Sequence, residues 1–434
     1  MIDRIVQWTV KYRHSTFIRV VARTLVLLFP LALIGSIAKV LSLTLLNADG
    51  FLYNLLVIDR WCNQAVIQIA QNCLSGITAV TMGMIGLLSS YGAAKYTAMH
   101  YHRDFQAAGL AGIITMGLMA YRFNRGGMAV SFDWRLLGYR FLLINLLVGF
   151  IVGQFFHWLG TPTAKANNAD HVIAVRQRSY STIKPLMVSL LMGIVIDIAL
   201  NIASAYSFFN GVSSSFQSQF HGSVAVLMKL LFSLISTFLG WVGLHGVFGM
   251  NWQNETSQMA ANLSYVLAHG GHWHVPYPYL SSSLYNVYCR FGGDGIILAL
   301  MIALLVVDHS KGTKRLAAWS IPPLFFNVDQ VAMFGIPVIL NPLYLLPMLL
   351  IPLINLFLAM TAIYLQLVPP IAFPILTGTP GPLMAFMGTA GYPTALIFSL
   401  LLLLADVVMY LPFVRLAVAV EKRIQLIDKR EAER

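Results

Sequence analysis

The stretch IPPLFFNVDQVAMFGIP at residues 321–337 combines an apolar composition with residues that interrupt a helix. Its apolar flanks suit a membrane, but the prolines, the glycine and the polar group NVDQ break any continuous spanning helix there. Irregular backbone at membrane depth persists only where it is buried in protein or lines a wet cavity. The stretch therefore predicts a re-entrant or discontinuous helix beside a polar site.

Two further stretches in the second half of the chain share this character. They read GLHGVFGMNWQNET at 243–256 and VPPIAFPILTGTPGPLMAF at 368–386. Breaks of this kind free backbone groups and helix ends to bind a polar solute. Because the first half has ordinary apolar runs and short loops, the pattern places the solute site in the second half.

The composition of the whole chain agrees with a membrane location. Of 434 residues, 58% are hydrophobic and 10% are charged, whereas soluble domains carry roughly 25% charged residues. Apolar runs of about 20 residues indicate helices rather than barrel strands. We expect an all-α polytopic integral membrane protein with about nine to ten spanning helices and re-entrant hairpins in the C-terminal half. The apolar runs lie near 24–46, 74–90, 105–121, 141–159, 186–206, 223–243, 294–307, 341–367 and 394–416.

The net charge of +12 is explained by basic helix ends on the cytoplasmic face, and not by nucleic-acid binding. The basic clusters expected there are the N-terminal head, Lys95 with Arg103, residues 176–184, residues 311–315 and the tail from Lys422. Alternating spans then place both termini inside. Arg122, Arg125, Arg135 and Arg140 fall on the opposite side, and the sequence offers no account of them.

The broken stretches supply the candidate solute-binding residues. His245 lies between glycines at the end of an apolar run, followed by polar residues that include Asn251. An imidazole donates and accepts hydrogen bonds, which suits a sugar hydroxyl. The alternative is a packed histidine bonded to a carbonyl.

Amide and carboxylate side chains in the 321–337 stretch suit the same chemistry. Asn327, Asp329 and Gln330 offer paired donors and acceptors, or else they cap the broken helix. In TGTPGP at 377–382, Thr379 and Gly381 face a solute or belong to a loop between spans.

Other chemistries find less support in the sequence. The HGGHWH histidines resemble zinc spacing, but no cysteine or carboxylate adjoins them closely, so we expect an aromatic loop without metal. No motif of nucleophilic or acid–base catalysis stands out, so we expect neither a cofactor nor a catalytic residue in this chain. An ion-coupled transporter would need a partnered intramembrane carboxylate, for which Asp197 and Asp406 are candidates.

Four stretches in this order resemble the membrane (IIC) component of the bacterial sugar phosphotransferase system, of the lactose/cellobiose (diacetylchitobiose) type. They are PLALIGS at 30–36, GLHG at 243–246, FGGDGIILAL with KGTKRLA and FFNVDQVAMFGIPVILNP from 291 to 342, and TGTPGP with LMAFMGTAG from 377. The similarity runs over nearly the whole chain.

The resemblance implies a homodimer in the bacterial cytoplasmic (inner) membrane. It implies a scaffold and dimerisation domain at 1–222, a sugar-binding transport domain at 223–416, and a cytoplasmic tail helix at 417–434. The sugar domain would move to give alternating access. A separate cytoplasmic IIB protein, itself supplied by IIA, would phosphorylate the disaccharide.

The resemblance also implies site residues. His245 matches the family's sugar-contacting histidine, and Asn327 matches an Asn of its FNINEP motif. That motif reads FNVDQV here, so the family's glutamate falls on Gln330, and Asp329 stands where an asparagine is usual. Glutamine keeps hydrogen bonding but loses the charge. The rival hypothesis is therefore a sugar sensor that no longer transports and signals through its C-terminal tail.

Overall fold

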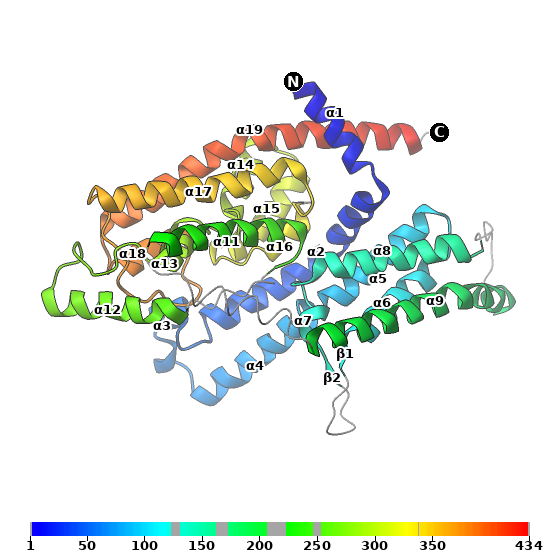
Figure 1. Ribbon diagram of the computed structural model, residues 1–434, viewed down its shortest axis with the longest axis horizontal. Coiled ribbons are helices and arrows are strands. Elements are labelled where there is room, and N and C mark those ends of the chain that lie inside the picture. The colour runs from blue at the N-terminus through cyan, green and yellow to red at the C-terminus, as the bar shows by residue number, and fades with distance from the viewer. Residues whose placement is uncertain are drawn as a thin grey trace.

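Helices dominate the computed structural model, which describes residues 2–122, 131–161, 172–205, 223–245, 253–336 and 338–432. Within these ranges the strands are a short antiparallel pair, β1 (Tyr121–Arg122) and β2 (Ser131–Phe132). The architecture confirms the predicted all-α class. Figure 1 shows the helices between residues 85 and 205 at one end of the molecule and most of the late helices at the other.

The first half of the chain forms a bundle in which small residues allow close helix packing. Its elements are α1 (Ile2–Arg13), α2 (Thr16–Thr44), α3 (Phe51–Leu55), α4 (Gln64–Thr81), α5 (Ile85–His100), α6 (Phe105–Ala120), α7 (Trp134–Leu137), α8 (Leu142–Leu159) and α9 (Val172–Ala205). Helix α5 packs against both α6 and α8. A Cβ added at Gly149 of α8 would lie 2.3 Å from the Ser90 carbonyl oxygen of α5. Small residues at such contacts are typical of membrane helices, because apolar lipid does not drive helices together.

The apolar run predicted near 74–90 is divided in the structure. Helix α4 ends at Thr81 and α5 begins at Ile85, with Met82–Met84 between them. The run looked continuous because all three joining residues are apolar or small, and hydropathy carries no information about backbone direction. The helix predicted near 24–46 begins earlier, at Thr16, and so includes Arg19 and Arg23.

The second half combines long helices with short broken ones. Its elements are α11 (Ser223–Val242), α12 (Gln253–His269), α13 (Ser281–Tyr288), α14 (Ile297–Val307), α15 (Lys311–Phe325), α16 (Gln330–Gly335), α17 (Pro342–Tyr364), α18 (Met384–Gly388) and α19 (Pro393–Ala432). Helices α14 and α17 pack on α19. The short helices α16 and α18 come from stretches that the sequence marks as broken, whereas α13 lies outside them. All three lie among the long helices (Figure 1).

Among the described residues, six segments are long and apolar enough to cross a membrane. They are Thr16–Thr44, Gln64–His100, Leu142–Leu159, Tyr180–Ala199, Pro342–Tyr364 and Pro393–Ile427, and two shorter apolar helices are Phe105–Ala120 and Ile297–Val307. Helix α19 exposes large apolar side chains, among them Leu401, which is 59% exposed, and Leu404, which is 61% exposed. Such faces are unfavourable in water and suit lipid, so the chain is a multi-pass membrane protein.

The two ends of the chain lie together. Arg13 Nη1 of α1 pairs with Glu421 Oε2 of α19 at 2.6 Å, and Figure 1 shows α1 crossing α19. The predicted tail at 417–434 continues α19 without interruption as far as Ala432. The boundaries predicted at 222 and 416 stay predictions.

Candidate functional site

The turn between α15 and α16 positions the NVDQ group. Helix α15 ends at Phe325, and Val328 N donates to the Pro323 carbonyl at 2.9 Å to close a tight turn. Asn327 has φ of 61°, a left-handed conformation that asparagine tolerates better than most residues. This backbone conformation lets the Asn327 side chain leave the helix axis and reach neighbouring loops.

Asn327 joins two loops that are distant in sequence. Its Oδ1 accepts from Gly292 N at 2.9 Å, and its Nδ2 donates to the Thr379 carbonyl at 3.2 Å. Gly381 passes so close that a Cβ there would lie 3.0 Å from Asn327 Oδ1. The FNVDQ, GGDG and TGTPGP segments therefore meet at one asparagine.

Asp329 holds the GGDG loop from the next position. It is 6% exposed, and its Oδ2 accepts from Asp294 N at 3.3 Å. The Asp294 carboxylate itself pairs with Arg290 Nε at 2.8 Å. The carboxylates of Asp329 and Asp294 and the guanidinium of Arg290 thus lie close together at the GGDG loop.

Gln330 is the first residue of α16, and His245 contacts the same helix at Met333. His245 N donates to the Arg140 carbonyl at 2.8 Å, and its Nε2 lies 3.2 Å from Met333 Sδ. His245 Nδ1 and Gln330 Oε1 are buried and have no hydrogen-bond partner among the described residues. Asp329 lies within electrostatic range of His245. Buried polar atoms are normally satisfied, so these two atoms are exceptions among the described residues, and the His245 ring also lies within reach of the Tyr139 backbone.

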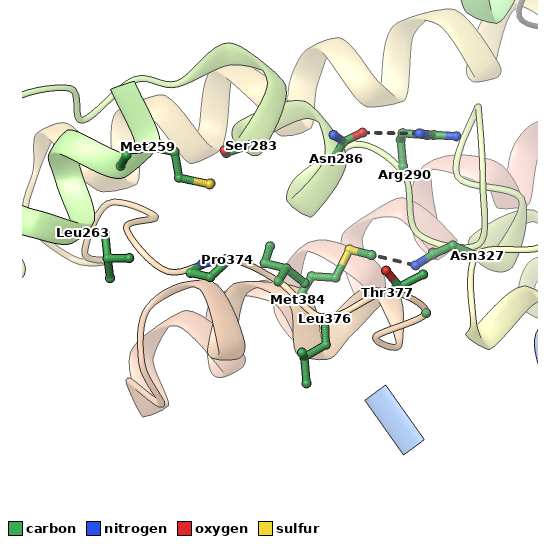
Figure 2. A pocket seen from close by; sticks show the side chains of 13 residues that line it. Met259, Leu263, Ser283, Asn286, Arg290, Asn327, Pro374, Leu376, Thr377 and Met384 are labelled. Carbon is green, nitrogen blue, oxygen red and sulfur yellow. Dashed lines mark hydrogen bonds between the residues drawn. The ribbon is translucent and has the colours of Figure 1, made fainter. Parts of the chain in front are cut away.

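A cavity of about 670 Å³ opens beside Asn327. Figure 2 shows Asn286 and Arg290 along the upper edge and Asn327 at the right. Arg290 Nη1 donates to Asn286 Oδ1 at 3.3 Å. The opposite walls are largely apolar and are formed by Met259, Leu263, Pro374, Ile375, Leu376 and Met384. This volume lies within the range of about 300–1,000 Å³ typical of small-molecule sites.

Several predicted residues lie behind the cavity rather than on its wall. Of the predicted set, Asn327 is the described residue that lines it. Thr379 is fully buried, and its hydroxyl donates to the Leu376 carbonyl at 2.7 Å, so it shapes the loop. Asn251 lies outside the described residues. The sugar-binding role assigned to this set stays a prediction.

The polar edge on α13 was missed by the sequence argument. Ser283, Asn286 and Arg290 all line the cavity. Ser283 and Asn286 lie three residues apart on one face of α13, and Arg290 follows just after the helix ends at Tyr288. The helical spacing of the first two is the signal that could have identified them.

The other candidate groups have structural partners. His269 stacks on Tyr265 with ring centroids 4.3 Å apart, and His272 packs against Tyr392 at 5.0 Å. In the part of the chain that is described, no three His, Cys, Asp or Glu side chains gather as metal ligands would. Asp406 Oδ2 accepts from Asn355 Nδ2 at 3.0 Å, and Asp197 pairs with Arg122 at 3.3 Å.

Apolar helices long enough to span a bilayer define a multi-pass membrane protein, and its second half contains a cavity of small-molecule size. The chain matches the family described as "Phosphotransferase system, EIIC" over residues 22–352, which is most of its length. It therefore belongs to this family and is the EIIC sugar permease component of a phosphotransferase system. Members of the family work with a sugar and with cytoplasmic IIB and IIA components.

The chain is also similar to several proteins whose descriptions name a sugar. The oligo-beta-mannoside-specific EIIC component of Bacillus subtilis is 20% identical over 380 residues, covering 85% of this chain and 83% of that protein. The cellobiose-specific EIIC component of Lactococcus lactis is 32% identical over 130 residues, covering 30% of this chain and 26% of that protein. The lactose-specific EIICB component of Staphylococcus epidermidis is 22% identical over 351 residues, covering 77% of this chain and 58% of that protein. The crystal structure of ChbC, the IIC component of an N,N'-diacetylchitobiose-specific phosphotransferase system, covers 96% of both chains at 20% identity with a TM-score of 0.42.

Proposed function

We propose that this EIIC component binds a β-linked disaccharide in the cavity beside Asn327 and moves it inward by alternating access. The relatives named above carry oligo-beta-mannoside, cellobiose and lactose in their descriptions, which supports a sugar of this class. In this proposal a separate IIB protein phosphorylates the sugar at the cytoplasmic face.

The observation that carries the proposal is the division of the cavity into a polar edge and apolar walls. Ser283, Asn286 and Arg290 offer donors and acceptors along one edge, Asn327 lies at one end, and side chains such as Met259 and Ile375 form the remainder. A sugar ring has the same division, because its hydroxyls lie around the edge and its C–H groups cover the faces. Hydrogen bonds fix the orientation, while contact with the walls removes apolar surface from water.

The unpartnered atoms of His245 and Gln330 extend this proposal to the inner end of the site. Both atoms are buried near α16, whose preceding turn carries Asn327. A sugar hydroxyl placed there would donate to Gln330 Oε1, and it would bond to the His245 ring in competition with the Tyr139 backbone. In our proposal Gln330 contributes hydrogen bonding where the family motif has a glutamate.

The short helices supply the moving part of the proposed cycle. Helices α13, α16 and α18 carry the loops that meet at Asn327, so the loops would shift together. A rigid group of this kind exposes the sugar alternately to either side. We further propose that the protein is a homodimer in the inner membrane with both termini in the cytoplasm.

Binding is tested by calorimetry on the purified protein with cellobiose, lactose and diacetylchitobiose. We expect Asn286→Ala to weaken binding of the preferred sugar about tenfold, which corresponds to one hydrogen bond of about 1.4 kcal/mol. Asn72→Ala is the matched control, since Asn72 is exposed on α4, away from the cavity. Equal affinity in both variants would remove the cavity from the proposal.

Transport is tested by uptake of the labelled sugar in cells that also produce soluble IIA and IIB partners. We expect the sugar to accumulate in phosphorylated form, and accumulation to fall with Asn286→Ala but not with Asn72→Ala. Intact binding without uptake of any sugar would contradict transport and leave a binding protein.

A further inference from the structure

A second cavity, of about 310 Å³, lies between α2, the end of α4 and the α7 region. Three cationic side chains line it: Lys39 of α2, Arg135 of α7, and Arg140 in the turn that follows. The aromatic rings of Trp134 and Tyr139 complete the wall. Lys39 Nζ lies 5.8 Å from the Tyr139 ring centroid, which is cation–π distance.

This cavity has an excess of positive charge. No described residue that lines it is acidic, and none of its three cations forms an ion pair within the described part of the chain. Lys39 lies within electrostatic range of Asp329, which is not on the cavity wall. Like charges held together are unfavourable unless an anion joins them.

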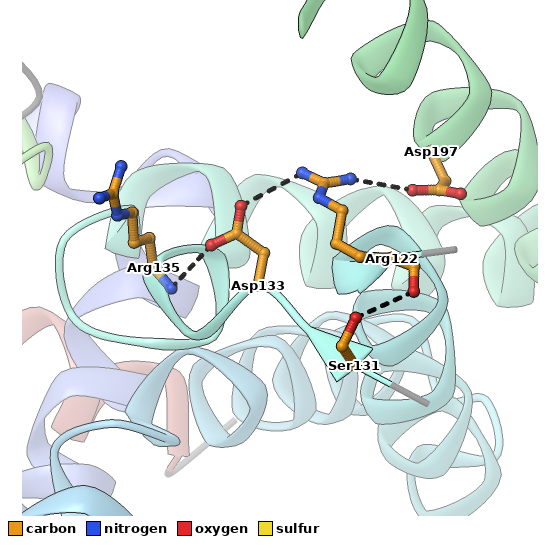
Figure 3. Close-up of polar contacts among 5 residues, drawn as sticks. All are labelled: Arg122, Ser131, Asp133, Arg135 and Asp197. Atoms are coloured by element: carbon orange, nitrogen blue, oxygen red, sulfur yellow. Dashed lines mark hydrogen bonds and ion pairs between the residues drawn. The ribbon is translucent and has the colours of Figure 1, made fainter. Parts of the chain in front are cut away.

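The carboxylates near this cavity form ion pairs with Arg122 rather than with the cations that line it. Asp133 pairs with Arg122 at 3.2 Å, and Arg122 pairs in turn with Asp197 of α9 at 3.3 Å. Asp133 Oδ1 also accepts from the backbone N of Arg135 at 3.0 Å. Figure 3 shows the Arg135 guanidinium directed away from the Asp133 carboxylate. Arg122 is thereby neutralised, whereas Arg135 is left facing the cavity.

The surroundings of the cavity point to a lipid. Trp134 is 55% exposed, and on α4 Val80 is 64% and Ile77 is 41% exposed beside the lining residues Thr78 and Ala79. Helix α4 belongs to a segment apolar enough to span a membrane. Cationic side chains beside an exposed tryptophan are typical of the level of lipid headgroups, and apolar helix surface next to them suits acyl chains.

We propose that this cavity binds the phosphate of an anionic phospholipid headgroup, with Arg135 and Arg140 as its main ligands and the acyl chains along α4. Arginine suits a phosphodiester because its planar guanidinium donates two parallel hydrogen bonds. The proposal also gives a role to two of the four arginines that break the orientation pattern of the sequence. The cavity is separate from the one beside Asn327, although the Arg140 carbonyl accepts from His245 N at 2.8 Å.

The test uses the full chain purified in detergent and then incubated with phosphatidylglycerol or phosphatidylcholine, with bound lipid counted by native mass spectrometry. We expect retention of phosphatidylglycerol and little retention of phosphatidylcholine. Arg135→Gln or Arg140→Gln should each weaken binding about fivefold, and the double variant about thirtyfold, since each basic group contributes about 1 kcal/mol. Arg60→Gln, an exposed arginine outside the cavity, is the control and should retain the lipid.

Inorganic phosphate in a parallel calorimetric titration separates the two sources of phosphate. Binding of inorganic phosphate without preference for phosphatidylglycerol would overturn the lipid assignment. Equal retention of phosphatidylglycerol by the wild type and the double variant would overturn the site itself. If the double variant is not monodisperse, lipid retention by the conservative variant Arg140→Lys is measured in its place. Its result is then read together with the headgroup preference of the wild type.

Discussion

At the scale of the residue, single side chains and single glycines hold the candidate sugar site together. Asn327 bonds to two loops that lie about 35 and 52 positions away along the chain. Gly293, with φ of 105°, leaves room for the Asp329 carboxylate. Residue type alone suggested that Asn327 and Asp329 matter, because amides and carboxylates are unusual in apolar sequence. Their partners could not be predicted, since they depend on which distant loops are brought near.

Gly293→Ala should destabilise the protein and weaken sugar binding. A Cβ at this position would lie 2.4 Å from Asp329 Oδ2, and the backbone conformation disfavours any side chain. We expect a loss of about 1–3 kcal/mol of stability, read as a lower Tm in detergent. Gly76→Ala is the control, because no heavy atom lies within 4 Å of a Cβ placed there. The same Tm for both variants would contradict the packing described.

At the scale of the element, the start of α15 shows how a short polar sequence defines a helix end. Ser310 accepts from Thr313 N at 3.2 Å as the N-cap, and Asp308 Oδ2 accepts from the hydroxyls of both Thr313 and Ser310. The Thr313 hydrogen bond, together with those from Ser310, holds the pKa of Asp308 below its usual value, although partial burial opposes this. Capping of this kind is local and can be predicted from sequence.

The lowered pKa of Asp308 makes the start of α15 sensitive to acid. A carboxylate with a lower pKa in the folded state stabilises that state above its unfolded pKa of about 3.9. This contribution is lost as pH falls through the folded pKa. Hydrogen exchange of the first turn of α15, corrected for intrinsic pH dependence, should therefore show less protection near pH 3 than near pH 6.

The matched variants isolate this effect. Asp308→Asn should remove the pH dependence in the first turn of α15. Asp59→Asn, at an exposed position elsewhere, should leave it unchanged. Protection in the wild type that does not change between the two pH values would rule out a role for the Asp308 carboxylate.

At the scale of the whole molecule, the first and last helices are joined. Arg13 and Glu421 form an ion pair between α1 and α19, and the two ends of the chain lie at the same edge in Figure 1. Hydropathy predicted the helices and the basic clusters predicted an orientation, but neither identifies contacts between the two ends. The large core cluster likewise includes residues of α2 as well as of α14, α17 and α19.

Both termini should be accessible from one side of the membrane. The test places epitope tags before α1 and after α19 and adds a protease to inverted and to right-side-out vesicles. We expect both tags to be cut in inverted vesicles and both to be protected in right-side-out vesicles, as the cytoplasmic orientation requires. Cleavage of only one tag in a given preparation would contradict the pairing of α1 with α19.

The sequence by itself determined the membrane class, the helical architecture and the segments where helices break, because hydropathy, proline and glycine act locally along the chain. It also singled out Asn327 and His245 as polar groups in apolar surroundings. Only the tertiary structure decided that Ser283, Asn286 and Arg290 form the polar edge of the cavity, and that Arg122 pairs with both Asp133 and Asp197 while Arg135 lines a second cavity. These are contacts between distant segments, and their geometry follows from how the helices pack rather than from the order of residues.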